Sequence, residues 1–504
     1  MKKAERYISI AFLAYFVVFV ILHIINLDRI PLVWFDEVMG LDPAVNAIFK
    51  EGYQSRIWPQ TGTENGFMAY LPVRFLFHML HLLLLPFEVF WMRIPWAIYF
   101  FTSAYILYLT SKAQNKTKWL VLLVVFLFIN DRTVFEVARS MRVDALSLMF
   151  SVLLYYCFYK RLFHWQMLLS SLLVFIHPNL WMIALVLFLD ASFKWNRTKD
   201  APIAKPNAWW LIPIGLLVLY GWSINFNING LYTQLFEHGS DHSASGGLIT
   251  RIGDHFYTRF WPYYLTQPWM PFIIYGALIM SVFKIWNRKY NALHIAVLAT
   301  HLYWLLALAP FYRYNAVLLL LSMICLLPEL QKMKWNKRSQ AFSLLLLILM
   351  PINTLAIHSL ALSERSNRDP KQVVNWLKNE LGEENCLVFG HDVTYYAVAT
   401  DMNKDYMMFN LQPTKFSFED YDAVYAFLGD YPDSFAHVFN DLPRLYFPEG
   451  KARSNLAHII SQIFNKPSYA GLMLYRVESK EDFELILEKM DKDNRSRKAK
   501  KSSH

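Results

Sequence analysis

The apolar run YISIAFLAYFVVFVILHIINL, residues 7–27, is followed closely by Trp34-Phe35-Asp36-Glu37. The hydrocarbon core of a bilayer is about 30 Å thick and needs about 20 apolar residues per helix, so this run is long enough to cross a membrane. No small-residue cleavage site of the signal-peptide kind follows, and we expect the helix to be retained. Two adjacent carboxylates directly after such a helix are costly to hold near lipid, so Asp36 and Glu37 are candidates for chemistry or ion binding.

The rest of the chain repeats this apolar pattern. Of its 504 residues 55% are hydrophobic and 17% charged, with the apolar residues in long blocks separated by short basic clusters. We therefore expect a polytopic, mostly α-helical membrane protein with about eleven membrane helices. The candidate spans are residues 7–27, 67–86, 95–109, 119–129, 145–159, 167–189, 209–224, 269–283, 293–308, 316–327 and 342–357. Three scattered cysteines, Cys157, Cys325 and Cys386, indicate neither a disulfide framework nor a zinc site.

Basic residues orient the helices, because cytoplasmic loops of membrane proteins carry an excess of Lys and Arg. This tendency predicts a protein of the cytoplasmic membrane with a cytoplasmic N-terminus and with the Asp36 loop outside. Most basic clusters then share the inner face: Lys2, Lys3, Arg6, Lys194, Arg197, Lys199, Lys205, Lys284, Arg288, Lys289, Lys332, Lys334, Lys337 and Arg338. Counting spans places a second set on the outer face, against the tendency: Lys112, Lys116, Lys118, Lys160 and Arg161.

Two outward loops of the membrane domain are long enough to have structure of their own. In the first, residues 28–66, the apolar spacing of residues 40–49 suits a short helix lying at the membrane interface. In the second, residues 225–267, the Gly/Ser-rich stretch 239–247 precedes an amphipathic, aromatic piece at 249–264. A flexible loop beside an interfacial helix is a candidate substrate gate.

A third outward segment begins at residue 365, where the composition becomes that of a soluble protein. Residues 370–381 are expected to form a helix, and residues 386–390, 423–428 and 471–477 to form strands. The predicted organisation is a transmembrane domain at 1–364, a small extracytoplasmic α/β domain at 365–491, and a basic, disordered tail at 492–504.

Several short motifs, taken in order, resemble those of the GT-C glycosyltransferases. They are the outward loop with Asp36-Glu37, an Arg142-Val143-Asp144 leading an apolar helix, a His177-Pro178 within another, and an Arg313-Tyr314 opening a late span. The nearest branches in pattern are bacterial relatives of the protein O-mannosyltransferases and the aminoarabinose transferases that modify lipid A. The resemblance covers the membrane portion and implies transfer of a sugar from a polyprenyl-phosphate carrier outside the cytoplasmic membrane.

One departure from these relatives concerns the segment before the second span. Where they often have Tyr-Pro-Pro or His-Pro-Pro, this chain has the sequence ENGFMAYLP, starting at Glu64. Glu64 stays a candidate substrate-binding residue, while the type of acceptor cannot be carried over.

The two carboxylates allow a catalytic and a structural interpretation. Glycosyl transfer to a hydroxyl or amine needs a base to take the acceptor proton, and Asp36 and Glu37 are the candidate catalytic residues. Alternatively, the pair caps a helix that begins near Val38, where acidic side chains satisfy free backbone N–H groups. The two interpretations are compatible, since capping would also hold the side chain in place.

The candidate substrate-binding residues carry alternatives as well. Arg313 and Tyr314 suit a phosphate cradle at the outer membrane boundary, or an interfacial anchor. Arg142 and Asp144 suit a structural ion pair that holds two helices together, and His177 suits hydrogen-bonded packing beside a helix loosened by Pro178.

The second loop also contains charged residues. Arg251 and Arg259 are candidates for the carrier phosphate or for lipid headgroups. Asp241, His242, Asp254 and His255 are weak candidates for a divalent metal, because no spacing among them matches a known metal motif, and metal dependence stays open. The net charge of +10 does not indicate nucleic-acid binding, because the basic residues are dispersed at helix ends and in the tail.

These features together favour an integral-membrane glycosyltransferase. Its partners would be a polyprenyl-phosphate-linked sugar donor, membrane lipids and an acceptor that is a glycolipid or envelope polysaccharide rather than a protein. The alternative from another class is a secondary transporter or flippase of a lipid-linked substrate, although no internal duplication of the kind transporters show is present. A third possibility is an inactive GT-C-like scaffold.

Overall fold

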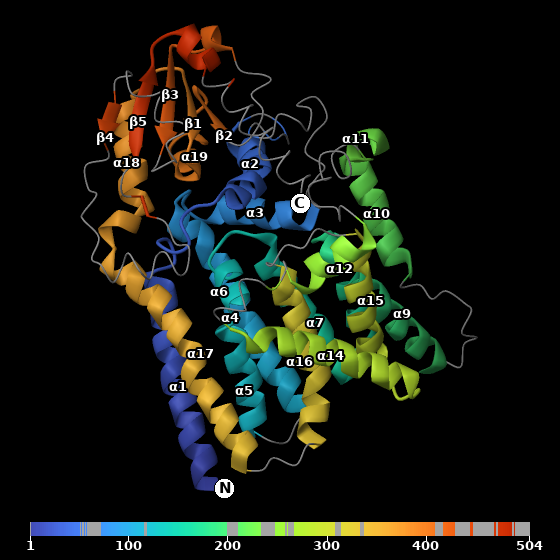
Figure 1. Cartoon of the computed structure of the whole chain (residues 1–504). Coiled ribbons are helices and arrows are strands. Elements are labelled where there is room, and N and C mark those ends of the chain that lie inside the picture. Colours follow the sequence, from blue (N-terminus) through green and yellow to red (C-terminus); the bar gives the residue numbers. More distant parts are fainter. Residues whose placement is uncertain are drawn as a thin grey trace. The chain divides into compact units, whose positions relative to one another are not determined.

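The protein is described here by a computed structural model. The model describes residues 2–50, 52, 55, 57, 72–114, 118–198, 210–232, 247–257, 260, 267–307, 314–332, 337–408, 417–428, 444–446, 468, 469, 472–485 and 488. These form two compact units (Figure 1). Unit 1 comprises Met1–Ile25, Tyr70–Arg74 and Ile94–Ala356, and unit 2 comprises Asn26–Ala69, Phe75–Arg93 and Ile357–His504.

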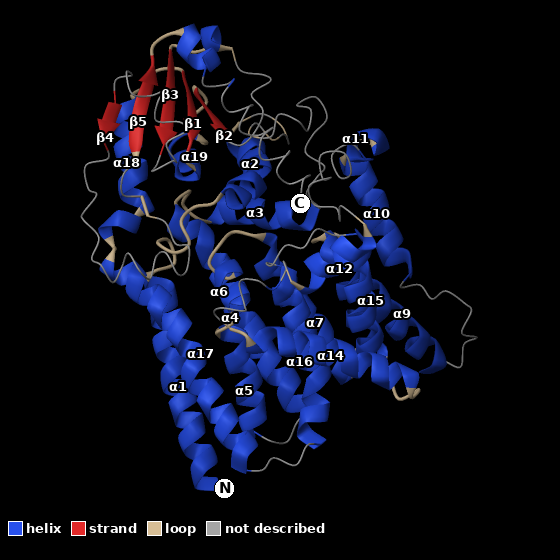
Figure 2. Cartoon of the chain, in the orientation of Figure 1, coloured by secondary structure: helices blue, strands red, loops and turns tan. Residues whose placement is uncertain are grey.

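Unit 1 is a bundle of helices (Figure 2). Its helices are α1 (Lys2–Ile25), α4 (Val89–Gln114), α5 (Lys118–Ile129), α6 (Arg132–Val137), α7 (Val143–Lys160), α8 (Phe163–Val174), α9 (Trp181–Thr198), α10 (Leu211–Ser223), α11 (Ile228–Tyr232), α12 (Leu248–Phe256), α14 (Trp269–Trp286), α15 (Ala292–Ala307), α16 (Asn315–Lys332) and α17 (Lys337–Ser363). Three of them, α7, α14 and α16, are 18 residues long and apolar enough to cross a membrane, and several shorter helices are also apolar. A multi-pass membrane protein has this composition.

The centre of the bundle is apolar and aromatic. Every side chain of α16 from Asn315 to Cys325 is buried. Helices α1, α4 and α5 meet through tilted aromatic rings, with Phe19 next to Phe100 and Phe12 next to Phe126. Some polar side chains within helices, such as Ser147, Thr110 and Ser171, donate to the backbone carbonyl four residues earlier, which satisfies them without a water molecule.

The expected span at residues 167–189 is wrong in one respect, because two helices occupy it. Helix α8 ends at Val174, a 3₁₀ turn follows at Pro178–Leu180, and α9 begins at Trp181. Pro178 has no N–H to donate and its ring clashes with the preceding turn, so the helix cannot continue through it. His177 caps the 3₁₀ turn by accepting a hydrogen bond from the Asn179 N–H.

Unit 2 contains a five-stranded sheet with the order β2-β1-β3-β5-β4. Its elements are α2 (Phe35–Phe49), α3 (Pro72–Leu84, of which residues 75–84 belong to this unit), α18 (Pro370–Leu381), β1 (Cys386–Gly390), α19 (Tyr395–Val398), β2 (Lys404–Met408), β3 (Ala423–Leu428), β4 (Arg444–Tyr446) and β5 (Met473–Val477). Strand β1 is parallel to both β2 and β3, whereas β5 is antiparallel to β3 and β4. The helix at 370–381 and the strands at 386–390 and 423–428 were predicted correctly, and β2 and β4 were missed.

Three expectations about the outward segments have different outcomes. The short helix expected at 40–49 begins earlier, at Phe35. Its residues 37–46 are all buried within the protein, so the prediction that this helix lies at the membrane interface is wrong. The loop that contains it belongs to the same compact unit as the residues after Ile357, not to the helix bundle. The tail at 492–504 lies outside the described residues.

Candidate active site

Asp36 and Glu37 lie in the first turn of α2. The residue at the N-cap, Trp34, makes no side-chain capping bond, and α2 begins at Phe35 rather than near Val38. The two carboxylates are therefore inside the first turn, where the positive end of the helix dipole favours negative charge.

Glu37 is held in a buried, two-point ion pair. Its carboxylate oxygens accept hydrogen bonds from Arg93, with Nη2 at 2.7 Å from Oε1 and Nε at 3.1 Å from Oε2. Neither side chain has any exposed surface. A bidentate pair of this kind fixes the orientation of both groups and neutralises the charge of the carboxylate.

The remaining donors of Arg93 fasten the turn that precedes α2. Its Nη1 donates to the carbonyls of Leu27 at 3.0 Å and Pro31 at 2.8 Å, and its Nη2 donates to Leu32 at 3.3 Å. Arg93 was missed by the sequence interpretation. The available signal was a single cation within the apolar stretch VFWMRIPW, just outside the predicted span at 95–109.

The loop after β1 brings a third carboxyl group to α2. Asp392 Oδ1 accepts a hydrogen bond from the Tyr406 hydroxyl at 3.3 Å. Loss of solvent around Asp392, followed by the negative charges of Glu37 and Asp36, raises the pKa of this carboxyl to about 8. Asp392 was also missed, although it follows the carboxyl end of a parallel strand, where sites in α/β sheets commonly form.

Two tyrosines of the same unit complete the surroundings of α2. The Tyr395 hydroxyl donates to Asp42 Oδ1 at 3.0 Å, and the Tyr469 hydroxyl accepts from the Val33 N–H at 3.2 Å. Burial raises the pKa of both phenols, so they stay protonated near neutral pH. These two bonds hold the residue two positions before α2 and a residue in the middle of the helix.

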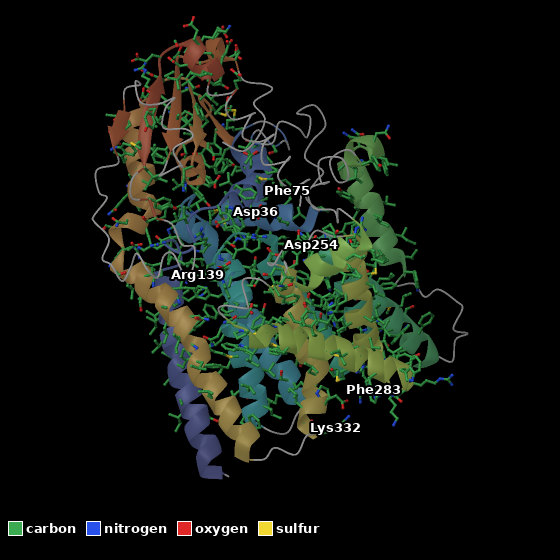
Figure 3. The ribbon with its side chains drawn as sticks, in the orientation of Figure 1. Asp36, Phe75, Arg139, Asp254, Phe283 and Lys332 are labelled. Atoms are coloured by element: carbon green, nitrogen blue, oxygen red, sulfur yellow. The ribbon has the colours of Figure 1, made fainter. Side chains whose placement is uncertain are left out.

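Asp36 is the accessible carboxylate of its pair. Its side chain is partly exposed, whereas Glu37 is fully buried and neutralised. Figure 3 labels the position of Asp36. A general base must reach the proton that it takes, so Asp36 is better placed for that role than Glu37. Both assignments stay predictions.

In unit 1, two of the predicted site residues meet. The rings of His177 and Tyr314 lie 5.2 Å apart between centroids, and Trp304 lies 6.1 Å from Tyr314. Trp304 also donates to the carbonyl of Asn179 at 3.2 Å. Because His177 Nδ1 accepts from the Asn179 N–H, the neutral ring carries its proton on Nε2.

Other predicted site residues of unit 1 have structural partners. Arg142 Nε lies 2.9 Å from Asp144 Oδ2, which confirms the expected ion pair, but both residues lie at the start of α7 and the pair does not join two helices. Arg251 Nη1 donates at 2.9 Å to the carbonyl of Leu306, in the last turn of α15. A cation is favourable at that end of a helix.

The metal prediction can be examined only in part. Within the described ranges, no three His, Cys, Asp or Glu side chains form a group that could hold a metal ion. His255 Nε2 lies 3.0 Å from His301 Nδ1, a hydrogen bond between two rings, and Asp254 precedes it in α12. The other two metal candidates, Asp241 and His242, lie outside the described residues. The same holds for three candidate substrate-binding residues: Glu64, Arg259 and Arg313.

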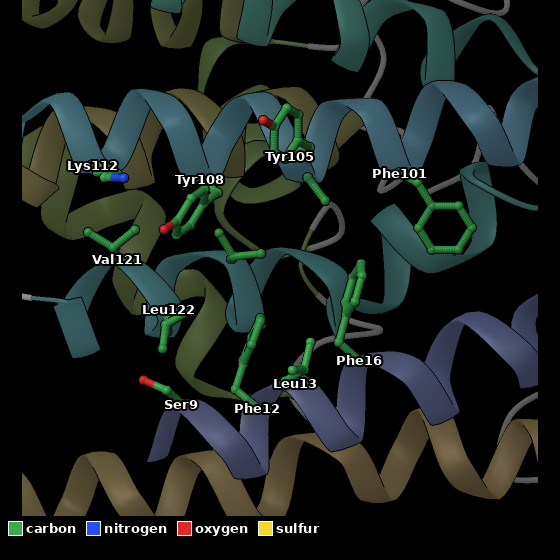
Figure 4. A pocket seen from close by; sticks show the side chains of 12 residues that line it. Ser9, Phe12, Leu13, Phe16, Phe101, Tyr105, Tyr108, Lys112, Val121 and Leu122 are labelled. Carbon is green, nitrogen blue, oxygen red and sulfur yellow. The ribbon is translucent and has the colours of Figure 1, made fainter. Parts of the chain in front are cut away.

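Unit 1 also contains an apolar cavity of about 960 Å³ among α1, α4 and α5 (Figure 4). Ser9 and Lys112 lie at one end of it, and Phe16 and Phe101 at the other. Helices α1 and α4 are therefore antiparallel, and Lys112 lies near the same end of the bundle as the N-terminus. The lining suits a hydrocarbon chain, with a cation at one end.

Comparisons with known proteins agree with this architecture. No protein-family model and no curated protein matches the sequence. Two solved structures of ArnT from Cupriavidus metallidurans are similar, one in the apo state and one bound to undecaprenyl phosphate. Each has a TM-score of 0.53 at 10% identity, over 94% of this chain and 98% of the other. The chain therefore has the fold of ArnT, a GT-C glycosyltransferase, and the fold class predicted from the motifs is confirmed.

Proposed function

We propose that this protein is an integral-membrane glycosyltransferase that moves a sugar from a polyprenyl-phosphate donor to an acceptor of the cell envelope. The observation that carries the proposal is the ArnT fold over 94% of the chain, together with a partly exposed carboxylate, Asp36. Asp36 lies in the first turn of α2, the helix that follows the first membrane helix. That one ArnT structure holds undecaprenyl phosphate supports a polyprenyl-phosphate donor here.

In the proposed reaction, the acceptor oxygen or nitrogen forms a bond to the anomeric carbon of the sugar. The bond from that carbon to the phosphate oxygen breaks, and the polyprenyl phosphate leaves with the electron pair. Asp36 takes the proton that the acceptor loses. Glu37 is already neutralised by Arg93, so it serves to hold the turn. Arg313 remains the proposed cation for the leaving phosphate.

The orientation of the chain supports an active site outside the membrane. Most of α3 clusters with unit 2, so we leave it out of the count of crossing helices. Residues 167–189 form two helices, and the described residues then contain eleven crossing helices. The basic clusters between the crossing helices then share the cytoplasmic side with the N-terminus, including Lys112, Lys118, Lys160 and Arg161, as the positive-inside tendency requires. The same count moves Arg142 to the outer side, with Asp36, His177 and Tyr314. We therefore propose that the candidate site faces the extracytoplasmic space.

The test is sugar transfer in membranes that contain the wild type, Asp36→Asn or Asp190→Asn. Each preparation receives labelled polyprenyl-phosphate sugars and an envelope extract as acceptor. Loss of a general base lowers kcat by about 100-fold or more, so Asp36→Asn should be nearly inactive. Asp190, a partly buried carboxylate paired with Lys194 in α9, is the matched control and should tolerate the change.

Two other results would change the assignment. Equal transfer by the wild type and Asp36→Asn, both correctly inserted, would remove Asp36 from the mechanism. No transfer from any donor, together with movement of lipid-linked label between leaflets, would favour the transporter alternative. Where the wild type transfers sugar, fractionating the labelled products distinguishes a glycolipid or polysaccharide acceptor, which we propose, from a protein acceptor.

A further inference from the structure

The apolar cavity of unit 1 is lined by one side of α1, the second half of α4 and the first half of α5. Among its lining side chains, the polar groups belong to Ser9, Tyr105, Tyr108 and Lys112. Leu13 and Tyr105 are 62% and 61% exposed although they line the cavity, so the cavity opens on their side of the bundle. In a membrane protein, an apolar opening of this kind faces lipid rather than water.

The polar groups of the cavity are not spread evenly. Figure 4 shows Ser9, Tyr108 and Lys112 toward one end and Phe101 at the other. The Lys112 ammonium lies 5.8 Å from the centre of the Tyr108 ring. Within the described part of the chain, no carboxylate forms an ion pair with Lys112. The cavity therefore has a cation at one end whose charge is not balanced by a neighbouring anion.

The same end of the bundle is rich in positive charge. Helix α1 begins with Lys2-Lys3-Ala4-Glu5-Arg6, where three cations outnumber one carboxylate, and α5 begins with Lys118. A net positive charge is complementary to an anionic group. Basic pockets between membrane helices on the cytoplasmic side are known to bind anionic lipid headgroups, and the proposed orientation places this end on that side.

The length of the cavity matches one leaflet of a bilayer. From Phe101 to Lys112 its wall follows α4 for about 16 Å, since a helix rises about 1.5 Å per residue. One leaflet is about half of the hydrocarbon core, or about 15 Å. An acyl chain with its headgroup beside Lys112 would thus reach the apolar end near Phe101. The polyprenyl-phosphate donor fits less well, because its phosphate reacts on the extracytoplasmic side in the proposed function.

We propose that this cavity binds an acyl chain of an anionic phospholipid of the cytoplasmic leaflet, with the lipid phosphate held by Lys112 and Tyr108. The Lys112 ammonium donates to the phosphate oxygens, and the Tyr108 hydroxyl adds a neutral donor. The site is separate from the candidate active site. Its assignment to the cytoplasmic leaflet rests on the proposed orientation, whereas the binding itself can be measured without it.

The first experiment tests the cation. Full-length protein in detergent receives phosphatidylglycerol or phosphatidylcholine, and native mass spectrometry counts the bound lipid. The wild type should bind the anionic phosphatidylglycerol more tightly than the zwitterionic phosphatidylcholine. Lys112→Gln should bind phosphatidylglycerol about 5-fold more weakly than the wild type, the effect expected of one lysine near a membrane surface. Lys289→Gln, an exposed lysine after α14, is the matched control and should keep the affinity of the wild type.

The second experiment tests the cavity. In Leu13→Trp the larger indole occupies the space meant for the acyl chain, so the affinity for phosphatidylglycerol should fall by about 10-fold or more. Val17→Trp, one turn later on α1, is the matched control, because Val17 is 49% exposed and does not line the cavity. The thermal midpoint without added lipid checks that both variants fold. If Leu13→Trp does not fold, the comparison of Lys112→Gln with Lys289→Gln decides the proposal.

Weaker binding in Lys112→Gln and Leu13→Trp, with both controls unchanged, supports the proposal. Equal phosphatidylglycerol binding by Lys112→Gln and Lys289→Gln, or by Leu13→Trp and Val17→Trp, overturns it. Displacement of phosphatidylglycerol by undecaprenyl phosphate, together with a raised KM for the sugar donor in Leu13→Trp, would also overturn it and assign the cavity to the donor tail. Because lipid binding is measured without sugar transfer, an empty cavity leaves the proposed function standing, and a failed transfer assay leaves the lipid site standing.

Discussion

At the scale of single residues, Arg93 is the group on which the order of the candidate site depends. Arg93→Leu leaves the Glu37 carboxylate buried without its cation and three backbone carbonyls without their donor. Removing one partner of a buried ion pair costs on the order of 3–5 kcal/mol, so the thermal midpoint in detergent should drop markedly. The double variant Arg93→Leu/Glu37→Leu should lose less than Arg93→Leu alone.

Arg288→Leu, at an exposed site after α14, is the control and should melt like the wild type. An Arg93→Leu protein with an unchanged thermal midpoint would contradict the structural role of the Arg93–Glu37 pair.

Asp36 and Glu37 could be identified from the sequence because two carboxylates follow an apolar helix, but their roles could not be separated. That separation depends on Arg93, 56 positions after Glu37, and this contact leaves no local pattern in the sequence.

At the scale of elements, the exit from β1 is the most constrained backbone of the sheet. In Gly390→Ala, the added Cβ would overlap the carbonyl oxygen of Phe427, and the residue would hold a φ of +137° that alanine rarely adopts. We expect a loss of about 3 kcal/mol in the free energy of unfolding and a displaced Asp392 turn. Gly382→Ala is a useful comparison, because its φ is also positive but nothing lies within 4 Å of the added Cβ.

Gly390→Ala should therefore be the less stable of the two variants and should lose sugar transfer more strongly. The reverse order would contradict the clash.

Elements of this domain were predictable where local signals were strong. The helix at 370–381 has Asp369 at its N-cap, which accepts a hydrogen bond from the Lys371 N–H, and Pro370 as its first residue. Its apolar residues also follow a clear amphipathic period. Strand β2 was missed because Lys404-Asp405-Tyr406 has too few apolar residues; it is a strand because it pairs with β1.

At the scale of the whole molecule, the proposed number of crossing helices equals the number expected from the sequence because two differences cancel. The apolar run at 67–86 was counted although most of α3 clusters with unit 2, and the run at 167–189 was counted once although Pro178 divides it. Hydropathy measures only apolar length, so it cannot distinguish a helix packed in a domain from one that crosses lipid. In the proposed order, each difference reverses the sidedness of the helices between residues 86 and 178, and the basic residues in the middle of the chain then agree with the positive-inside tendency.

The proposed order of crossing helices predicts the accessibility of three exposed positions. We expect a cysteine at Ala113, in the last turn of α4, and one at Arg288, after α14, to be protected from a membrane-impermeant maleimide in intact cells and to react after permeabilisation. A cysteine at Ile249, which is 87% exposed in α12, should react in intact cells. The native cysteines are all buried and give a low background. If Ala113→Cys reacts from outside while Ile249→Cys also does, α3 crosses the membrane and the orientation of the middle helices is reversed. Protection of Ala113 with reaction at Ile249 would place the loops of Arg142 and His177 on the outer side.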